Sequence, residues 1–117
     1  MCYNLLMTVK VSRKNAAKYG NKNVKAFDYV LPKLDSSLVY AELSGEHGEI
    51  KTSKRSRIYY ILDGDGQFVL NGDNIFVEKD DVIVIPPNTS YNYKAINSIL
   101  KILLLMELFY VKKPKKK

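Results

Sequence analysis

Short runs of β-branched, aromatic and leucine residues, separated by turn residues, constrain the fold of this chain more than any other feature. The runs are SLVYAEL (37–43), RIYYIL (57–62), QFVL (67–70), NIFVE (74–78), VIVIP (82–86), YNYKA (91–95) and ILKILLLMELFYV (99–111). The breaks between them, DGDG, NGD, KDD and PPNTS, have the composition of turns. Strands that recur every eight to twelve residues are typical of a sandwich or a barrel. The pattern therefore predicts an all-β fold.

Two local signals refine this prediction. Asn71 and Gly72 lie between two strand-like runs, and both residue types accept the positive φ angles of a tight hairpin turn. Near the amino terminus, Ser12 is a suitable N-cap and Gly20 a suitable stop for a short helix over SRKNAAKYG. We expect one β-hairpin at residues 67–78 and one short N-terminal helix at residues 12–20.

The length of 117 residues suits one domain, which we place at residues 1–111. The remainder, 112–117, is a basic tail with five lysines and Pro114, and such a composition predicts disorder. The formal net charge is +7, and removing those five lysines leaves +2. The body is therefore only mildly basic, and we regard nucleic acid as an unlikely partner, with the tail as the one segment that could contact it.

Other sequence features limit location and partners. Cys2 is the only cysteine, so neither an internal disulfide nor a cysteine-based zinc site can form. No signal peptide is evident, and a cytoplasmic location is expected. The apolar run at 99–111 contains Lys101 and Glu107 and is too short to span a bilayer.

Two groups of residues have a specific spacing. The first group is Gly45, Lys51, Ser53, Arg57 and Gly64, and the second is Asp80, Pro86, Asn88, Tyr91 and Ala95. This spacing resembles the two motifs of the cupin superfamily, G-x5-H-x-H-x3-E-x6-G and G-x5-P-x-G-x2-H-x3-N. The resemblance covers residues 37–105 and is that of a small single-domain, type-2-like cupin.

The resemblance implies a double-stranded β-helix, or jelly-roll barrel. It also implies where a metal would bind, because metal-binding cupins use three histidines and one glutamate. Those positions here are Lys51, Ser53, Arg57 and Tyr91, and none of these side chains is a usual ligand of a divalent metal. We therefore expect neither a metal nor another cofactor.

Alternation along strands predicts which side chains share a face. If the barrel forms, the residues expected inside it are Lys51, Ser53, Arg57, Tyr59, Tyr91 and Tyr93. Buried cations need water, a carboxylate or a bound anion. Asp28 and Glu42 could supply the carboxylate, and their places are left open. His47, in GEHGE, is expected in a surface loop.

Three functions remain open. The first is a metal-free module, expected to form a homodimer, that binds a small polar or anionic molecule such as a sugar, a carboxylate or a phosphate. The second is a metal-independent isomerase or epimerase that uses Tyr91 as the acid. The third is a structural dimeric cupin whose cavity is filled by its own side chains. Whether the chain is an enzyme is left undecided at this stage.

Overall fold

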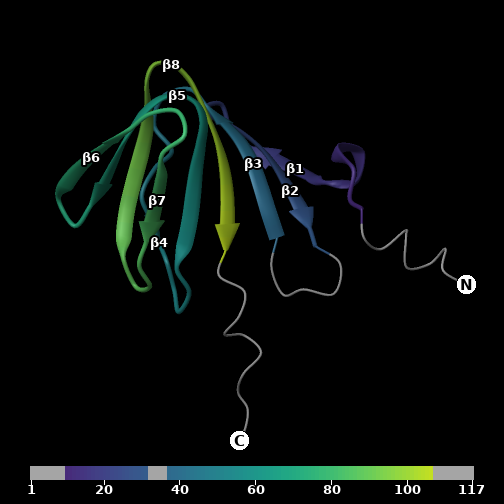
Figure 1. Cartoon of the computed structure of the whole chain (residues 1–117), viewed down its shortest axis with the longest axis horizontal. Helices are drawn as coiled ribbons and strands as arrows, with labels where there is room; N and C mark the ends of the chain where they lie inside the picture. Colours follow the sequence, from purple (N-terminus) through teal and green to yellow (C-terminus); the bar gives the residue numbers. More distant parts are fainter. Residues whose placement is uncertain (1–9, 32–36, 107–117) are drawn as a thin grey trace, which may run out of the picture.

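The computed structural model describes residues 10–31 and 37–106, and nearly every element in this part is a strand (Figure 1). The elements are the 3-10 turn η1 (Arg13–Asn15) and the strands β1 (Ala17–Gly20), β2 (Val24–Val30), β3 (Ser37–Leu43), β4 (Ile50–Lys51), β5 (Arg57–Leu70), β6 (Asp73–Val77), β7 (Val82–Ile85) and β8 (Ser90–Met106). The predicted basic tail at 112–117 lies outside the described residues. The all-β prediction is confirmed.

One antiparallel sheet of eight strands runs in the order β1-β2-β3-β8-β5-β6, with β4 paired to β8 and β7 paired to β5. The long strands β5 and β8 make this sheet curl. The second half of β8 pairs with β3 and with the start of β5, whereas its first half pairs with β4 and with the end of β5. Each long strand therefore belongs to both walls, and the sheet closes into a jelly-roll barrel (Figure 1).

The bend in β5 occurs at DGDG, which the sequence predicted as a break between strands. The strand instead continues through these residues, with register shifts against β8 between Ile61 and Asp65. Gly64 has φ +87°, and a Cβ placed on it would lie 2.3 Å from the carbonyl oxygen of Ile99. Glycine is therefore required where the two long strands cross closely at the bend.

The short N-terminal helix is reduced to a single 3-10 turn. Ser12 makes no side-chain cap hydrogen bond, and the helical stretch ends at Asn15. Residues Ala17–Gly20 form β1, in which Lys18 pairs with Phe27 of β2. The pairing with β2 satisfies the backbone of this segment better than an isolated two-turn helix could.

The hairpin prediction is confirmed. Asn71 and Gly72 have φ angles of +49° and +87° and connect β5 to β6, with Leu70 opposite Asp73. Within the described ranges, no helix has the length and apolar character to cross a membrane.

Candidate functional site

Alternation along β5 and β8 directs Arg57, Tyr59, Tyr91 and Tyr93 into the barrel. Tyr59 and Tyr91 are each 1% exposed and Tyr93 is 5% exposed, whereas Arg57 is half-buried. The neighbour on each side of Tyr59, Ile58 and Tyr60, faces the outside of the sheet and is more exposed. The structure thus brings four of the six predicted site residues together.

A chain of hydrogen bonds links three of these side chains. Nη1 of Arg57 donates to the Tyr91 hydroxyl at 3.0 Å, and the Tyr91 and Tyr59 hydroxyls are hydrogen-bonded to each other. Burial, with smaller contributions from Tyr93 and Tyr91, raises the pKa of Tyr59 far above its usual value, so this phenol stays neutral. Burial also raises the pKa of Tyr93. Burial lowers the pKa of Arg57, but the contacts with Tyr91 and Tyr59 more than offset this, and the net shift is upward.

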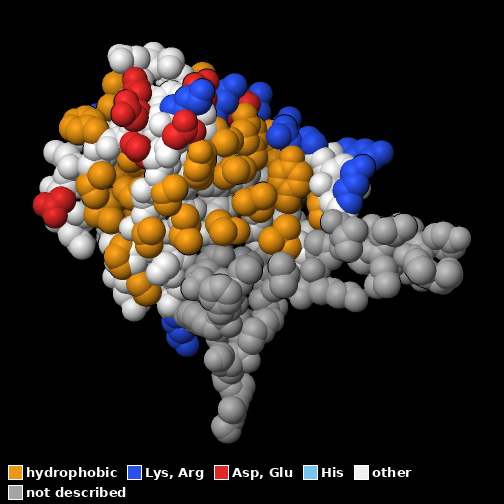
Figure 2. All heavy atoms as spheres, in the orientation of Figure 1, with side chains coloured by type: hydrophobic (Ala, Val, Ile, Leu, Met, Phe, Trp, Pro, Cys, Tyr) orange, Lys and Arg blue, Asp and Glu red, His pale blue; other side chains and the backbone are white. Residues whose placement is uncertain are grey.

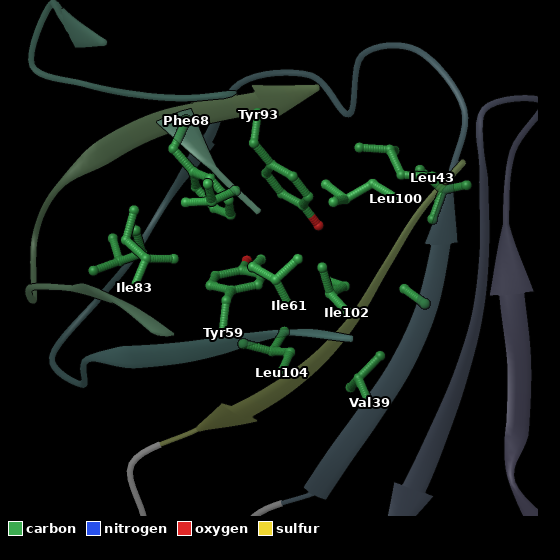
Figure 3. Close-up of a cluster of buried hydrophobic side chains, with 14 of the residues drawn as sticks. Val39, Leu43, Tyr59, Ile61, Phe68, Ile83, Tyr93, Leu100, Ile102 and Leu104 are labelled. Carbon is green, nitrogen blue, oxygen red and sulfur yellow. The ribbon is translucent and has the colours of Figure 1, made fainter. Parts of the chain in front are cut away.

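Phe68 completes an aromatic cluster that occupies the interior; the cluster is Tyr59, Phe68, Tyr91 and Tyr93. Phe68 stacks on Tyr93 with ring centroids 4.7 Å apart, and Tyr59 meets both rings edge-on at 5.2 and 5.3 Å. Figure 3 shows Tyr59, Phe68 and Tyr93 facing one another, with Ile61 and Ile83 beside them. The space between the walls is therefore occupied by side chains in contact.

Lys51 and Ser53 do not point into the barrel, and this part of the prediction is wrong. Both are exposed, whereas Thr52 between them is 2% exposed and its hydroxyl donates to the carbonyl oxygen of Pro86 at 2.6 Å. Ile50 lies opposite the inward-facing Tyr91, so the next residue, Lys51, must face outward. Side chains therefore alternate from Ile50 to Ser53 in the opposite phase to the one assumed from the motif, and the phase changes in the loop between Ser53 and Arg57.

Glu42 and Asp28, the two acidic residues that the sequence did not place, lie on opposite faces of the sheet. Glu42 is on the outer face and accepts a 2.7 Å hydrogen bond from the Tyr40 hydroxyl. Asp28 shares the inner face with Val24 and Ala26, and its Oδ1 is buried without a hydrogen-bond partner in the described part of the chain. Alternation along VKAFDYV could have placed Asp28 inside, because Val24 and Ala26 mark that face.

His47 is a residue whose contacts the sequence analysis missed. Its ring stacks on Tyr93 with centroids 4.8 Å apart, and its backbone N–H donates to the Tyr93 carbonyl oxygen. His47 does lie in the loop between β3 and β4, as expected, and its ring packs against one end of the aromatic cluster. No sequence pattern signals this contact, because His47 lies outside the strands.

These side chains set limits on the chemistry of the interior. Guanidinium and neutral phenols donate hydrogen bonds readily but are poor ligands of a divalent cation. In the residues that the structure describes, no three His, Cys, Asp or Glu side chains gather in a way that could hold a metal ion. The residues at the motif positions therefore do not fit the metal that the resemblance associates with them. A hollow of about 520 Å3 opens elsewhere, beside Asp65, Phe76 and Glu78.

Comparison with known sequences gives one partial relative. No family model matches the chain. An uncharacterised protein of Methanocaldococcus jannaschii is 45% identical over 47 residues, which are 39% of this chain and 38% of that protein. The chain thus spans well under half of that relative, and the match assigns no activity.

Comparison with solved structures is more extensive. A protein described as a predicted oxalate decarboxylase from Thermotoga maritima superposes with a TM-score of 0.73 and 21% identity, covering 86% of this chain and 99% of that one. The Schizosaccharomyces pombe Cnp3 cupin domain gives 0.73 and 16%, over 89% and 77%. The nucleoside dehydratase Pac13 of Streptomyces gives 0.72 and 20%, over 86% and 89%. At such identities the likeness concerns the fold, and it agrees with the strand order and motif spacing: the chain has the cupin fold.

Proposed function

We propose that this protein is a non-catalytic cupin domain in which the barrel interior serves as the packed core of the molecule. The observation that carries the proposal is the aromatic cluster of Tyr59, Phe68, Tyr91 and Tyr93, which occupies the centre of the barrel with ring centroids 4.7 to 6.5 Å apart. Close-packed side chains leave a ligand nothing to fill without displacing a ring.

The polar atoms of the cluster support the same conclusion. A buried hydroxyl without a partner costs about 1–3 kcal/mol, so buried tyrosines normally find partners. Here the Tyr59 and Tyr91 hydroxyls are hydrogen-bonded to each other, and Arg57 donates a hydrogen bond to Tyr91. The hydrogen-bonding capacity that a bound molecule would exploit is thus largely used within the chain. The isomerase alternative needs the Tyr91 hydroxyl to contact a substrate, and with 1% exposure this residue offers no such access.

One observation favours a second candidate, a small-molecule site at Arg57. The guanidinium has five donors, one of which is used by the bond to Tyr91, and its side chain is half-exposed. The groups that set its pKa are tyrosine hydroxyls, with no carboxylate from the described ranges among them. A carboxylate, phosphate or sugar hydroxyl could accept the remaining donors. Lys51 and Ser53, both exposed, would belong to the rim of such a site.

Thermal unfolding in the presence of small molecules separates the two candidates. The panel is phosphate, sulfate, oxalate, a sugar acid, a neutral sugar and uridine, each titrated from the micromolar to the millimolar range. A packed core predicts no saturable rise in Tm, whereas a binding site predicts one. The Arg57→Met variant should abolish a genuine rise, and Lys22→Met, an exposed cation in the turn before β2, should not. A saturable, Arg57-dependent shift would refute the packed-core function and establish the second candidate.

A further inference from the structure

The strand β6 lies at one end of the strand order, and among the described residues it pairs with β5 alone. Its other edge is therefore open, as the left side of Figure 1 shows. The backbone groups along an open edge can pair with a further strand, and natural proteins usually protect such edges with charges, a proline or a covering segment. An open edge of this kind is a potential binding surface for an extended chain.

The register of the hairpin determines which backbone groups of β6 point away from β5. In a two-residue hairpin the pair next to the turn, here Leu70 and Asp73, exchanges both hydrogen bonds, and such pairs alternate with pairs that exchange none. Asn74 and Phe76 occupy positions of the second kind. Their N–H and C=O groups therefore point to the open edge, and no hydrogen bond in the part of the chain that the structure describes uses these four groups.

Apolar side chains are exposed on both faces of β6. Ile75 is 37% exposed although its partner on β5, Phe68, is completely buried, and Phe76 is 68% exposed on the other face. A neighbouring strand on the open side would cover both side chains. Hydrophobic side chains are visible in Figure 2 over the region where Figure 1 places β6. The open edge thus combines unpaired backbone groups with apolar surface.

The region around this edge is acidic, although the chain as a whole carries a formal net charge of +7. Residues 63–81 contain six of the twelve Asp and Glu residues and a single cation, Lys79. Figure 2 shows acidic side chains close to the hydrophobic ones in this region. Two copies of β6 paired at this edge would bring like charges together, so the charge favours a partner that is basic.

The hollow of about 520 Å3 lies directly beside Phe76 on this edge. It is lined by Asp65, Glu78 and Asp81 together with Ile96. Asp81 accepts a 2.8 Å hydrogen bond from the backbone N–H of Glu78, which fixes the carboxylate in place. A long cationic side chain could lay its apolar stem against Phe76 and put its charged end among the carboxylates. The hollow therefore has the chemistry of a pocket for arginine or lysine.

We propose that the open edge of β6 binds an extended peptide of a partner protein, in which basic side chains alternate with apolar ones. The peptide adds an antiparallel strand to the sheet by pairing with the backbone groups of Asn74 and Phe76. Alternation then sends its basic side chains to the face of Phe76 and Glu78, and its apolar side chains to the face of Ile75. Main-chain hydrogen bonds provide affinity, and the acidic hollow selects arginine or lysine.

Peptide binding and hydrogen exchange test the proposal together. The probe is a short peptide, blocked at both ends, in which arginine alternates with valine. We expect saturable binding by fluorescence anisotropy. Amide hydrogen exchange, followed by NMR, should slow at least about tenfold at Asn74 and Phe76 when the peptide binds. Ile75 is the internal control, because its N–H already pairs with β5 and should change little.

Altered peptides separate strand pairing from charge. In the proposed antiparallel strand the arginine N–H groups point to β6 and the valine N–H groups point to solvent. N-methylation of the arginines should therefore abolish binding, whereas N-methylation of the valines should be tolerated, although both peptides keep the same side chains and charge. A peptide with glutamate in place of every arginine should not bind, because it would place acids against acids.

Matched variants of the protein test the same edge. Asn74→Pro removes one outward donor, and an edge strand tolerates proline where the N–H faces solvent. We expect it to weaken binding about tenfold or more, whereas Asn74→Ala keeps the donor and should bind within about twofold. Glu78→Gln should weaken binding about two- to fivefold, as expected for loss of an exposed ion pair. Circular dichroism checks that each variant is folded.

Several results would overturn the proposal. Failure of the arginine–valine peptide to bind at roughly millimolar concentration would exclude a basic extended partner. Binding that leaves exchange at Asn74 and Phe76 unchanged, or that survives N-methylation of the arginines, would show that charge alone holds the peptide. Protection of both amides in the protein without peptide, growing with protein concentration, would assign the edge to a second copy. None of these measurements depends on whether small molecules bind at Arg57.

Discussion

At the scale of residues, the main feature of the barrel interior is a guanidinium group that is hydrogen-bonded to a pair of tyrosine hydroxyls. Arg57 enters the barrel from β5 and donates to Tyr91, whose hydroxyl is in turn bonded to Tyr59. A hydrogen bond from a charged donor is worth more than one between neutral groups. The Tyr91 hydroxyl therefore connects the half-exposed end of the interior to its buried centre.

Replacing Tyr91 with phenylalanine should destabilise the protein by about 1–2 kcal/mol, because two partners lose their hydrogen bond while the ring volume is kept. Urea unfolding followed by fluorescence measures the change in the free energy of unfolding. Tyr60→Phe is the matched control: its hydroxyl donates to Asp80 on the surface, and its loss should cost less than about 0.5 kcal/mol. Equal stability of Tyr91→Phe and the unmodified chain would show that the hydroxyl network contributes nothing.

The buried tyrosines also predict a dependence on alkaline pH. Burial raises the pKa values of Tyr59 and Tyr93 in the folded state above the value of 10.0 for a free tyrosine. Their contribution to stability is therefore complete below pH 10 and is lost as the pH rises further, because only the unfolded state ionises. Tyr59→Phe should reduce the slope of unfolding free energy against pH by about 1.4 kcal/mol per pH unit between pH 10.5 and 12. The same slope in both proteins would contradict the assignment.

Prediction from sequence succeeded at residues that lie on long strands. Arg57, Tyr59, Tyr91 and Tyr93 face inward as alternation required, because β5 and β8 keep their period through those positions. The prediction for Lys51 was wrong because β4 pairs with β8 at only two residues. Motif spacing alone could not determine which side chains of so short a strand face inward.

At the scale of elements, the two long strands determine the fold. β5 and β8 each contribute to both walls, so the bend at DGDG holds the barrel closed. Turn composition could not distinguish this bend from a loop, because glycine and aspartate favour both. SLVYAEL coincides with β3, and the hairpin at Asn71 and Gly72 formed as expected, since those signals are local. The prediction of an N-terminal helix was wrong because part of this segment pairs with β2, and local sequence signals do not reveal such a pairing.

Two glycines with the same φ test the bend. Gly64 and Gly72 both have φ +87°, but a Cβ on Gly64 would clash with the Ile99 carbonyl oxygen, whereas a Cβ on Gly72 would meet nothing within 4 Å. Gly72→Ala should therefore cost only the left-handed backbone penalty of about 1–2 kcal/mol. Gly64→Ala should cost more, about 3–5 kcal/mol, with a loss of cooperative unfolding if the barrel opens. Similar Tm values for the two variants would mean that the close crossing of β5 and β8 is not important for stability.

At the scale of the whole molecule, the sheet has two apolar faces, and curling buries only one of them. The inner face becomes the core, where Tyr59, Phe68 and Leu100 are at most 1% exposed. On the outer face, Val82, Val84 and Leu105 remain 56%, 54% and 38% exposed. Sequence alternation could not reveal this, because the strands near the centre of the sheet are apolar at consecutive positions and so carry little period-two signal.

Net charge at this scale leads to a last prediction, about polyanions. The formal charge is +7, and deleting residues 112–117 removes five lysines and lowers it to +2. Binding to duplex DNA should then weaken, and the slope of log affinity against log salt should become shallower by up to about 4.5, since each neutralised phosphate contributes about 0.9. The free energy of unfolding should stay within about 0.5 kcal/mol, because a segment of five lysines and one proline is poorly suited to a core. A truncated chain that keeps the full salt dependence would locate the polyanion contact on the folded body. Lys25 on β2 and Lys101 on β8 would then be the next residues to replace.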